Sequence, residues 1–295
     1  MEYIKGYIGC EQDYLNVEIY DDRDMQMLRQ YKDEKNVTIS MENIRYLTEF
    51  TNVEQLIITP GQAPDNVSEI LATQEHLRAL KLDYDETEPC TSWCVDISKL
   101  KRLEFLFSRS SLNFKGVSGC LSLKTLAVSN WYNESIAQLK DSGIDTLRIG
   151  CGRLKCLDGI EQLPLLILSL SHLRFLTDIA SVRESHIKIL EIDSCNRIEN
   201  IENLLPATLE YLMLYGKNRI SSGAFINQYP QLKRVMLDVT IEDSDLSAFD
   251  TLDSAILLTD RRSYNRKNSQ LPKNDRIYSL QSIPLWRNIY SGRKI

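Results

Sequence analysis

Histidine is scarce in this chain of 295 residues, which contains only His76, His172 and His186. Their positions suggest no arrangement of serine, histidine and aspartate, or of cysteine and histidine, of the kind that nucleophilic catalysis requires. The sequence also lacks a glycine-rich phosphate loop, an HExxH metal motif and an EF-hand loop. These absences predict a non-enzymatic protein with no catalytic residues, no cofactor and no metal site.

Long hydrophobic runs are also missing. No apolar stretch approaches the ~18 residues that a membrane-spanning helix needs. The N-terminus has no charged segment followed by an apolar one, as a secretory signal would. The seven cysteines are odd in number and irregularly spaced, which favours reduced thiols over a disulfide framework. We therefore expect a cytoplasmic monomer with no membrane partner.

The two signs of charge are unevenly distributed. From Arg261 onward there are nine lysines and arginines and one acid, Asp275, for a net +8. Residues 1–260 carry 26 basic and 40 acidic residues, for a net −14. An acidic body disfavours nucleic acid as a partner and favours a basic protein, although it also serves solubility alone.

A template of the form LxxLxL, in which x is any residue, recurs along most of the chain. Close copies are Leu77-Leu80-Leu82, Leu123-Leu126-Val128, Ile144-Leu147-Ile149, Leu165-Leu168-Leu170, Ile187-Leu190-Ile192, Leu209-Leu212-Leu214 and Leu232-Val235-Leu237. Looser copies are Val53-Leu56-Ile58, Leu103-Leu106-Ser108 and Asp253-Ile256-Leu258, and the pairs Val37/Ile39 and Val17/Ile19 extend the pattern upstream. This regularity predicts about twelve stacked repeats.

Each copy predicts a short strand whose two central apolar residues point inward while their neighbours point outward. One such unit cannot bury its apolar face alone, so stacked units build a continuous core and a long parallel sheet. The residues that follow the strand at 144–149 include Leu154, Leu157, Ile160 and Leu163, which recur every three positions. A period of three predicts a 3₁₀ turn or one short helical turn.

The stretch LRIGCGRLKCLDGIEQLP resembles the short repeats of leucine-rich repeat proteins, in particular the bacterial internalin-like group. The resemblance covers residues 14–260. It implies an α/β solenoid with a curved parallel β-sheet on the concave face and 3₁₀ or short helical turns on the convex face. We expect an N-terminal cap and first degenerate repeat over 1–36, the solenoid over 37–260, and a C-terminal cap or basic tail over 261–295.

The family usually places asparagine or cysteine at the ninth repeat position, where the side chain hydrogen-bonds the turning backbone. Here that position holds Asp85, Trp131, Gly152, Leu173, Cys195, Lys217 and Thr240. Only Cys195 matches. We therefore expect each turn to be stabilised in its own way.

Large side chains that point outward from the expected strands are candidates for binding, because exposed aromatics and arginine dominate binding hot spots. We predict that the partner-binding residues are Phe105, Phe107, Arg109, Trp131, Tyr132, Arg148, Glu191, Asp193, Tyr211, Met213, Tyr215, Arg234 and Met236.

These observations predict a protein-protein interaction module that binds a basic partner through its concave face. An inhibitor or a toxin-neutralising immunity protein would act in this way. One alternative is a nucleic-acid-associated protein that uses the basic tail, which contains Trp286 and Tyr290. Another is a metal or redox protein that uses Cys90 with Cys94 or Cys151 with Cys156. Phe105 and Phe107 could also be covered by the insertion around Cys90 or by the tail.

Overall fold

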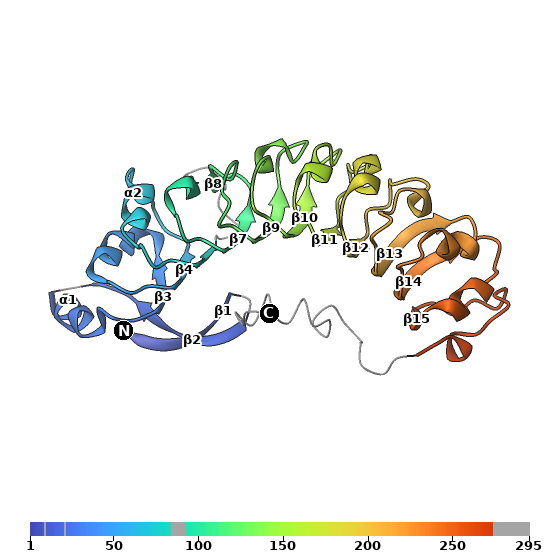
Figure 1. Ribbon diagram of the computed structural model, residues 1–295. Helices are drawn as coiled ribbons and strands as arrows, with labels where there is room; N and C mark the ends of the chain where they lie inside the picture. The colour runs from blue at the N-terminus through green and yellow to red at the C-terminus, as the bar shows by residue number, and fades with distance from the viewer. Residues whose placement is uncertain (9, 21, 84–92, 274–295) are drawn as a thin grey trace. The chain divides into compact units, whose positions relative to one another are not determined.

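The computed structural model describes residues 1–8, 10–20, 22–83 and 93–273. The described residues form two compact units, one within residues 1–128 and the other within residues 129–273. The described strands form a 13-stranded sheet in the order β1-β2-β3-β4-β5-β7-β9-β10-β11-β12-β13-β14-β15, as well as a two-stranded sheet of β6 and β8 (Figure 1).

The first unit contains strands β1 (Glu2–Ile8), β2 (Cys10–Val17), β3 (Asn36–Ser40), β4 (Gln55–Thr59), β5 (Ala79–Leu82), β6 (Val95–Asp96), β7 (Phe105–Ser110) and β8 (Phe114–Lys115). Its helices are α1 (Asp22–Leu28), α2 (Val67–Ala72) and the 3₁₀ helices η1 (Arg29–Tyr31), η2 (Met41–Glu49) and η3 (Ile97–Lys99). Strand β9 (Thr125–Trp131) begins in this unit and ends in the second.

The second unit contains β10 (Thr146–Gly152), β11 (Ile167–Ser171), β12 (Ile189–Asp193), β13 (Tyr211–Ile220), β14 (Arg234–Ile241) and β15 (Ser254–Leu257). All of its described helices are 3₁₀ helices, namely η4 (Ala137–Leu139), η5 (Ile160–Gln162), η6 (Ala180–Glu184), η7 (Ile201–Asn203), η8 (Gly223–Gln228), η9 (Ser247–Thr251) and η10 (Asn268–Gln270).

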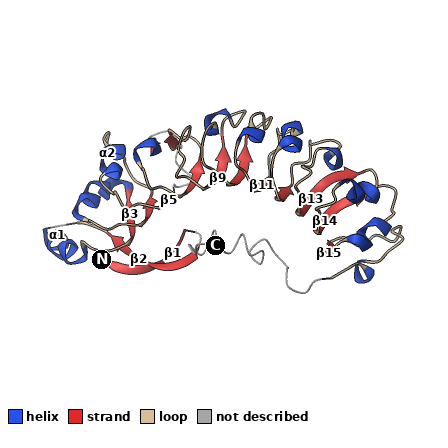
Figure 2. Cartoon of the chain, in the orientation of Figure 1, coloured by secondary structure: helices blue, strands red, loops and turns tan. Residues whose placement is uncertain are grey.

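Consecutive strands of the second unit run parallel, with their template residues aligned. Leu147 of β10 pairs with Leu168 of β11, which pairs with Leu190 of β12, and all three side chains are fully buried. Within each unit the helices lie on one side of the strands (Figure 2). The inward side chains therefore form a core between the strands and the turns. One parallel strand and one short turn per repeat is the architecture of a leucine-rich repeat solenoid.

The returning helices of the second unit are 3₁₀ helices because their apolar residues recur every three positions. After β10, Leu157, Ile160 and Leu163 are buried, and the Leu163 N–H donates to Ile160 O at 3.1 Å. Gly159 precedes η5 with a φ of 89°, a left-handed conformation that glycine adopts without a steric cost. The predicted turn type is confirmed here.

The sequence template was wrong by one or two residues in the first and last repeats. Pairing of β2 with β3 aligns Leu15 and Val17, not Val17 and Ile19, with the buried pair of β3. Pairing of β14 with β15 makes Ala255 and Leu257 the inward residues. The template favoured the larger Ile256 and Leu258 over alanine. Ile256 instead lies on the opposite sheet face, and Leu258 is 56% exposed.

The position that corresponds to the family's ninth-position asparagine was also predicted one residue too early in β13. This strand shifts its register against β14 between Tyr215 and Arg219, and Gly216 there has a φ of 119°. The irregularity moves the ladder position from Lys217 to Asn218, whose side chain is buried. The amide of Asn218 donates to Cys195 O at 3.3 Å and to Ile198 O at 3.0 Å. One asparagine of the ladder is therefore present, one residue later than the template places it.

A β-hairpin begins the first unit, with β1 antiparallel to β2. Tyr14 of β2 points to the face opposite Leu15 and is nevertheless fully buried. It clusters with Ile57, Ala79 and Phe105 from β4, β5 and β7, and its hydroxyl donates to Gln55 Oε1 at 2.9 Å. Strand β1 also contacts β4 and β5. The hairpin therefore covers part of the sheet face that the sequence template leaves open.

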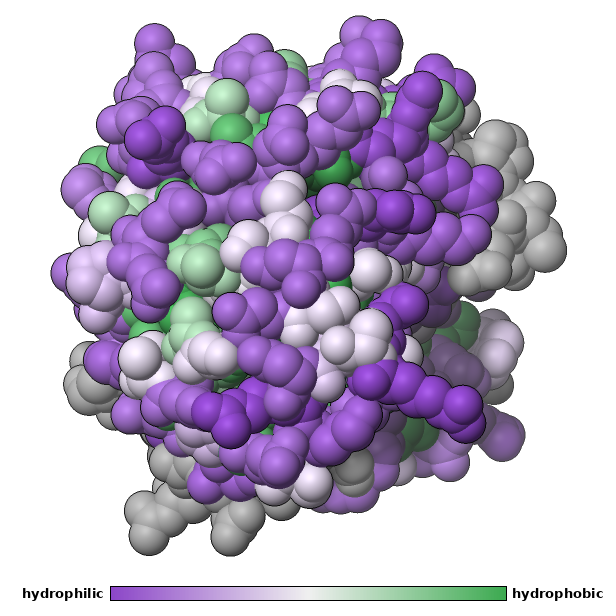
Figure 3. All heavy atoms as spheres, turned by 90° about the vertical axis from the view of Figure 1, so that its right-hand side faces the viewer, coloured by the Kyte–Doolittle hydropathy of each residue, from purple (hydrophilic) through white to green (hydrophobic). Residues whose placement is uncertain are grey.

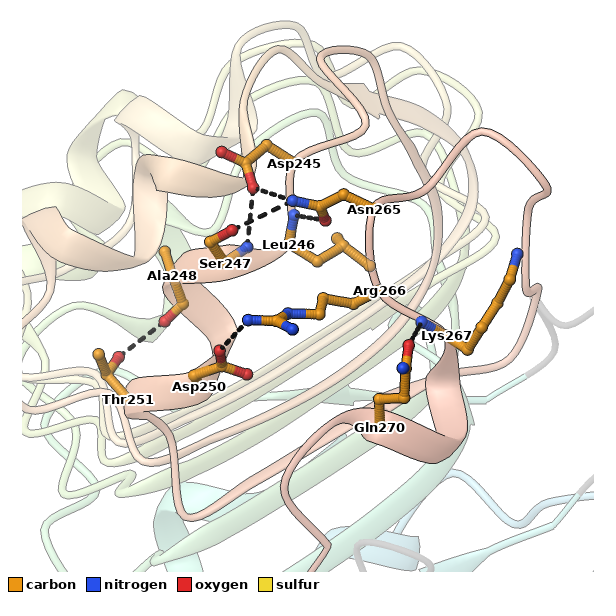
Figure 4. Close-up of polar contacts among 10 residues, drawn as sticks. All are labelled: Asp245, Leu246, Ser247, Ala248, Asp250, Thr251, Asn265, Arg266, Lys267 and Gln270. Atoms are coloured by element: carbon orange, nitrogen blue, oxygen red, sulfur yellow. Dashed lines mark hydrogen bonds and ion pairs between the residues drawn. The ribbon is translucent and has the colours of Figure 1, made fainter.

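The segment after β15 contacts the last repeat of the second unit through Asn265 and Arg266 (Figure 4). The side chain of Asn265 accepts from the Leu246 N–H at 2.8 Å and donates to Asp245 Oδ1 at 2.6 Å. Arg266 forms an ion pair with Asp250 at 3.0 Å. The positive charge of Arg266, one of the basic residues of the predicted tail, is thus paired with a carboxylate of the same unit. The C-terminal cap over 261–295 remains a prediction as a whole, because residues 274–295 lie outside the described residues.

The same segment protects the outer edge of β15. The Ala255 N–H donates to Pro272 O at 2.9 Å, and the Leu257 N–H donates to Asn268 Oδ1 at 3.0 Å. A strand edge without such partners is a template for aggregation. Seen from the side of β15, the molecule presents a mostly hydrophilic surface, with apolar groups only in small areas between polar ones (Figure 3).

Charges alternate in the residues that immediately precede several strands. Lys188, Glu210 and Lys233 precede β12, β13 and β14, and backbone hydrogen bonds of 2.8 and 2.9 Å hold them in adjacent positions. Glu210 accepts from Lys233 at 2.7 Å and forms a second ion pair with Lys188 at 3.1 Å. In the first unit, Lys35 and Glu54 form the same kind of pair at 2.6 Å. This charged row supports the strand register.

We expect Glu210→Gln to destabilise the protein by about 1 kcal/mol at neutral pH. The hydrogen bond from Lys233, joined by Lys188, lowers the pKa of Glu210 from its usual 4.5, although partial burial opposes this. A lowered folded-state pKa stabilises above 4.5, and the stabilisation is lost as the pH falls through the folded value. Urea unfolding of both proteins at neutral and acidic pH should show the difference shrinking in acid.

Glu134→Gln is the control, since Glu134 also pairs with a lysine, Lys155, but its side chain is 66% exposed. Equal effects of the two changes at every pH would contradict the proposed role of Glu210.

Candidate functional site

The sheet face of the second unit that points away from the 3₁₀ turns carries a group of large side chains on β12 to β15. Pairing aligns Tyr211 with Arg234, Met213 with Met236, and Met236 with Ile256. We call this group the tyrosine patch. It consists of Glu191, Asp193, Tyr211, Tyr215, Arg234, Met236 and Ile256, all of them partly exposed.

Contacts between neighbouring strands hold the aromatic side chains of the tyrosine patch in place. The guanidinium of Arg234 lies over the ring of Tyr211, 5.3 Å from its centroid. The hydroxyl of Tyr215 donates to Met236 Sδ at 3.0 Å. Burial, followed by the charges of Glu191 and Asp193, raises the pKa of Tyr215 to about 12. The phenol therefore remains a neutral hydrogen-bond donor at physiological pH.

Glu191 and Asp193 give one side of the patch a negative charge. Glu191 Oε2 accepts from the Ser169 hydroxyl at 2.6 Å, and Asp193 Oδ1 accepts from the Ser194 hydroxyl at 2.8 Å. Among the residues that the structure describes, neither carboxylate forms an ion pair with a lysine or arginine. Their charge is therefore not neutralised within the described part of the molecule.

Two of the predicted binding residues, Trp131 and Met213, are buried. Trp131 is 0% exposed, and its indole N–H donates to Ser135 O at 3.1 Å. The strand turns inward after its outward residues, so the ninth position faces the core, not the rim. Met213 is only 6% exposed, although it lies on the outward face, because large side chains on both neighbouring strands cover it. The expectation that these two side chains are exposed was wrong.

Tyr132 and Arg148 lie outside the tyrosine patch. Tyr132 follows β9 and is 36% exposed. Arg148 is half-buried on β10, which β11 separates from β12. Neither residue contributes to the group on β12 to β15.

The predicted residues of the first unit are held by contacts within the unit. Phe105 packs in the cluster around Tyr14, and the ammonium of Lys81 lies 5.6 Å from the ring centroid of Phe107. Arg109 forms an ion pair with Asp83, which also pairs with Lys81 at 3.3 Å. The observed cover of Phe105 comes from the N-terminal hairpin. The other covers considered, the insertion around Cys90 and the tail beyond residue 273, lie outside the described residues.

Reasoning from the sequence missed two residues on the outward side of their strands, Tyr14 in the first unit and Ile256 in the second. The template, which was displaced by one residue in the last repeat, assigned Ile256 to the inward face. A repeat spacing of 20 residues, from Val235 to Ala255, would have placed Ile256 on the outward face. The burial of Tyr14 depends on a hairpin that folds back over β4 and β5, for which the chain has no local motif.

No set of three or more histidine, cysteine, aspartate or glutamate side chains gathers to hold a metal ion in residues 1–83 and 93–273, so far as these are described. Cys94 and Cys151 are exposed and free, Cys156 donates to Asp158 Oδ2 at 3.1 Å, and Cys90 lies outside the described residues. In Cys195, burial raises the thiol pKa to about 11, which disfavours the reactive thiolate. No helix within the described ranges is long and apolar enough to cross a membrane.

No family model and no curated protein matches this sequence. Among the solved structures that are similar is an internalin, inlF, from Listeria monocytogenes. The two share 17% sequence identity over 81% of this chain and 71% of the internalin chain, with a TM-score of 0.46. The assignment to the leucine-rich repeat fold rests on the repeat, strand order and parallel register of this chain itself.

Proposed function

We propose that this protein is a non-enzymatic binding protein that holds a partner protein against the tyrosine patch. The observation that supports this most directly is the placement of Tyr211 and Tyr215 beside Arg234 and Met236 on the outward face of a hydrogen-bonded sheet. Tyrosine and arginine bury large areas with few rotatable bonds, which makes them frequent binding anchors.

The patch needs little rearrangement before it binds. Arg234 is already stacked on Tyr211, and Tyr215 already donates to Met236. A surface that is ordered in the free protein loses little conformational entropy on association. The protein would thus bind as a rigid scaffold, whereas a flexible loop would first have to be ordered.

The charge of the patch indicates a partner with basic groups. Glu191 and Asp193 lie next to the aromatic side chains and lack a cationic partner among the described residues. A lysine or arginine from the partner could pair with them as its apolar residues cover Met236 and Ile256. Occupying a basic surface in this way would inhibit the partner, and neutralising a toxic protein is one form of such inhibition.

We expect Tyr211→Ala/Tyr215→Ala to weaken binding of the partner at least ~30-fold, since a single anchor residue already contributes about 2 kcal/mol or more. Partners are captured from extracts of the native host, identified, purified and titrated against wild type and the double variant. Tyr3→Ala/Tyr20→Ala is the matched control, because these tyrosines are well exposed and lie in the first unit.

The control should bind as wild type does, and affinity should fall as salt rises if the acidic side chains contribute. Equal binding by wild type and the Tyr211/Tyr215 variant would show that the partner uses another surface. A loss that occurs equally in the control would point to a general effect of removing tyrosines.

A further inference from the structure

A pocket of about 660 Å³ lies in the first unit where the strands begin. Its lining residues are Arg78, Lys101, Arg102, Glu104, Ser122 and Lys124. The Glu104 N–H donates to Arg78 O at 2.8 Å, and the Lys124 N–H donates to Glu104 O at 2.9 Å. These bonds place the residues that precede β5, β7 and β9 side by side. Lys101, Arg102 and Ser122 come from the turns just before them.

The pocket lining has four cationic side chains and one carboxylate. Arg78 and Glu104 form a two-pronged ion pair with distances of 3.1 and 2.7 Å. Lys101 donates to Ser98 O at 2.8 Å, and Arg102 Nη1 lies 3.1 Å from His76 Nδ1. Neither Lys101 nor Arg102 meets a carboxylate among the described residues. The positive charge that they add therefore remains without a counter-charge there.

Arg78, Glu104 and Lys124 alternate in charge as the rows elsewhere in the chain do, and the pocket differs from those rows by two further cations, Lys101 and Arg102. Lys35 faces Glu54, and Lys188 and Lys233 share Glu210, so in those rows each base has an acid beside it. The whole chain carries a formal charge of −6. The positive charge that Lys101 and Arg102 add to this pocket is thus opposite in sign to the net charge of the chain.

We propose that this pocket binds a small phosphate-bearing molecule. The guanidinium of Arg102 can donate two parallel hydrogen bonds to phosphate oxygens, and Lys101 supplies a mobile point charge. The hydroxyl of Ser122 supplies a further donor. The aliphatic stems of the arginines and lysines give the walls an apolar part, and the volume suits a small organic ligand. This site is independent of the tyrosine patch and does not rest on the proposed function.

Isothermal titration calorimetry of the full chain with inorganic pyrophosphate at low salt tests the site. We expect saturable binding by wild type and a loss of at least ~10-fold in affinity for Lys101→Ala/Arg102→Ala, because two charge-assisted contacts disappear. Arg174→Ala/Arg197→Ala is the matched control, since it removes the same charge from exposed positions of the second unit. It should bind within ~2-fold of wild type if the effect is local.

Glu104→Gln provides a test that loss of folding cannot imitate. It removes the only carboxylate of the lining and releases Arg78 from its ion pair, so we expect affinity to rise ~3-fold or more. Absence of pyrophosphate binding by wild type would overturn the proposal. Equal weakening by the two double variants, or unchanged affinity in Glu104→Gln, would also overturn it.

Discussion

Trp131→Ala should destabilise the protein by about 3–5 kcal/mol, the usual range for deletion of a large buried aromatic side chain. Trp131 is one of the largest fully buried residues, and its indole N–H donates to Ser135 O. Its backbone is equally constrained, because the Arg153 N–H donates to Trp131 O at 2.7 Å. Removing the ring leaves a cavity that the following repeat cannot fill without moving its own backbone.

The measurement is the free energy of unfolding in urea, with Tyr132→Ala as the matched control. Tyr132 is the next residue, is also aromatic, and is 36% exposed, so its removal should change the free energy by less than about 1 kcal/mol. Similar losses for the two variants would contradict the assignment of Trp131 to the core. Unchanged stability in Trp131→Ala would contradict it as well.

Asn218→Ala should destabilise the protein by about 2–4 kcal/mol, because two buried carbonyl groups lose their donor. The side-chain amide of Asn218 donates to both Cys195 O and Ile198 O in the turn of the preceding repeat. Alanine keeps the backbone conformation available but cannot satisfy either acceptor. The effect should therefore exceed that of an ordinary surface substitution.

Lys217→Ala is the control for this second variant. Lys217 stands at the ninth position by simple counting, yet its side chain is exposed, so its loss should cost less than about 0.5 kcal/mol. Urea unfolding again provides the free energies. A larger loss in Lys217→Ala than in Asn218→Ala would mean that the template count, and not the strand irregularity, locates the ladder position.

The repeat architecture could be predicted because its signal is both local and multiplied. Leu147, Leu168 and Leu190 stand at equal template positions, and parallel pairing brings them into one fully buried row. The error in the last repeat has the opposite cause. Ala255 occupies an inward position with too little hydrophobic surface to be recognised, whereas Ile256 beside it is larger and faces outward.

The candidate site was predicted in part. Tyr211, Tyr215, Arg234 and Met236 were expected on the outward face, and the strand pairing places them there. Alternation along a strand determines which way a side chain points but not what covers it. Met213 and Phe105 both point outward, and neighbours from other strands bury the first and pack against the second.

The sequence alone was sufficient to predict the repeat period, the parallel strands and the 3₁₀ turns, because these features depend on the spacing of residues within one repeat. Accessibility was decided by contacts between residues far apart in the chain. Tyr14 packs against Phe105 from a hairpin about ninety residues away, and Asn218 reaches Cys195 only because β13 departs from regular pairing. Burial is a property of the assembled surface, so a pattern read within one repeat could not determine it.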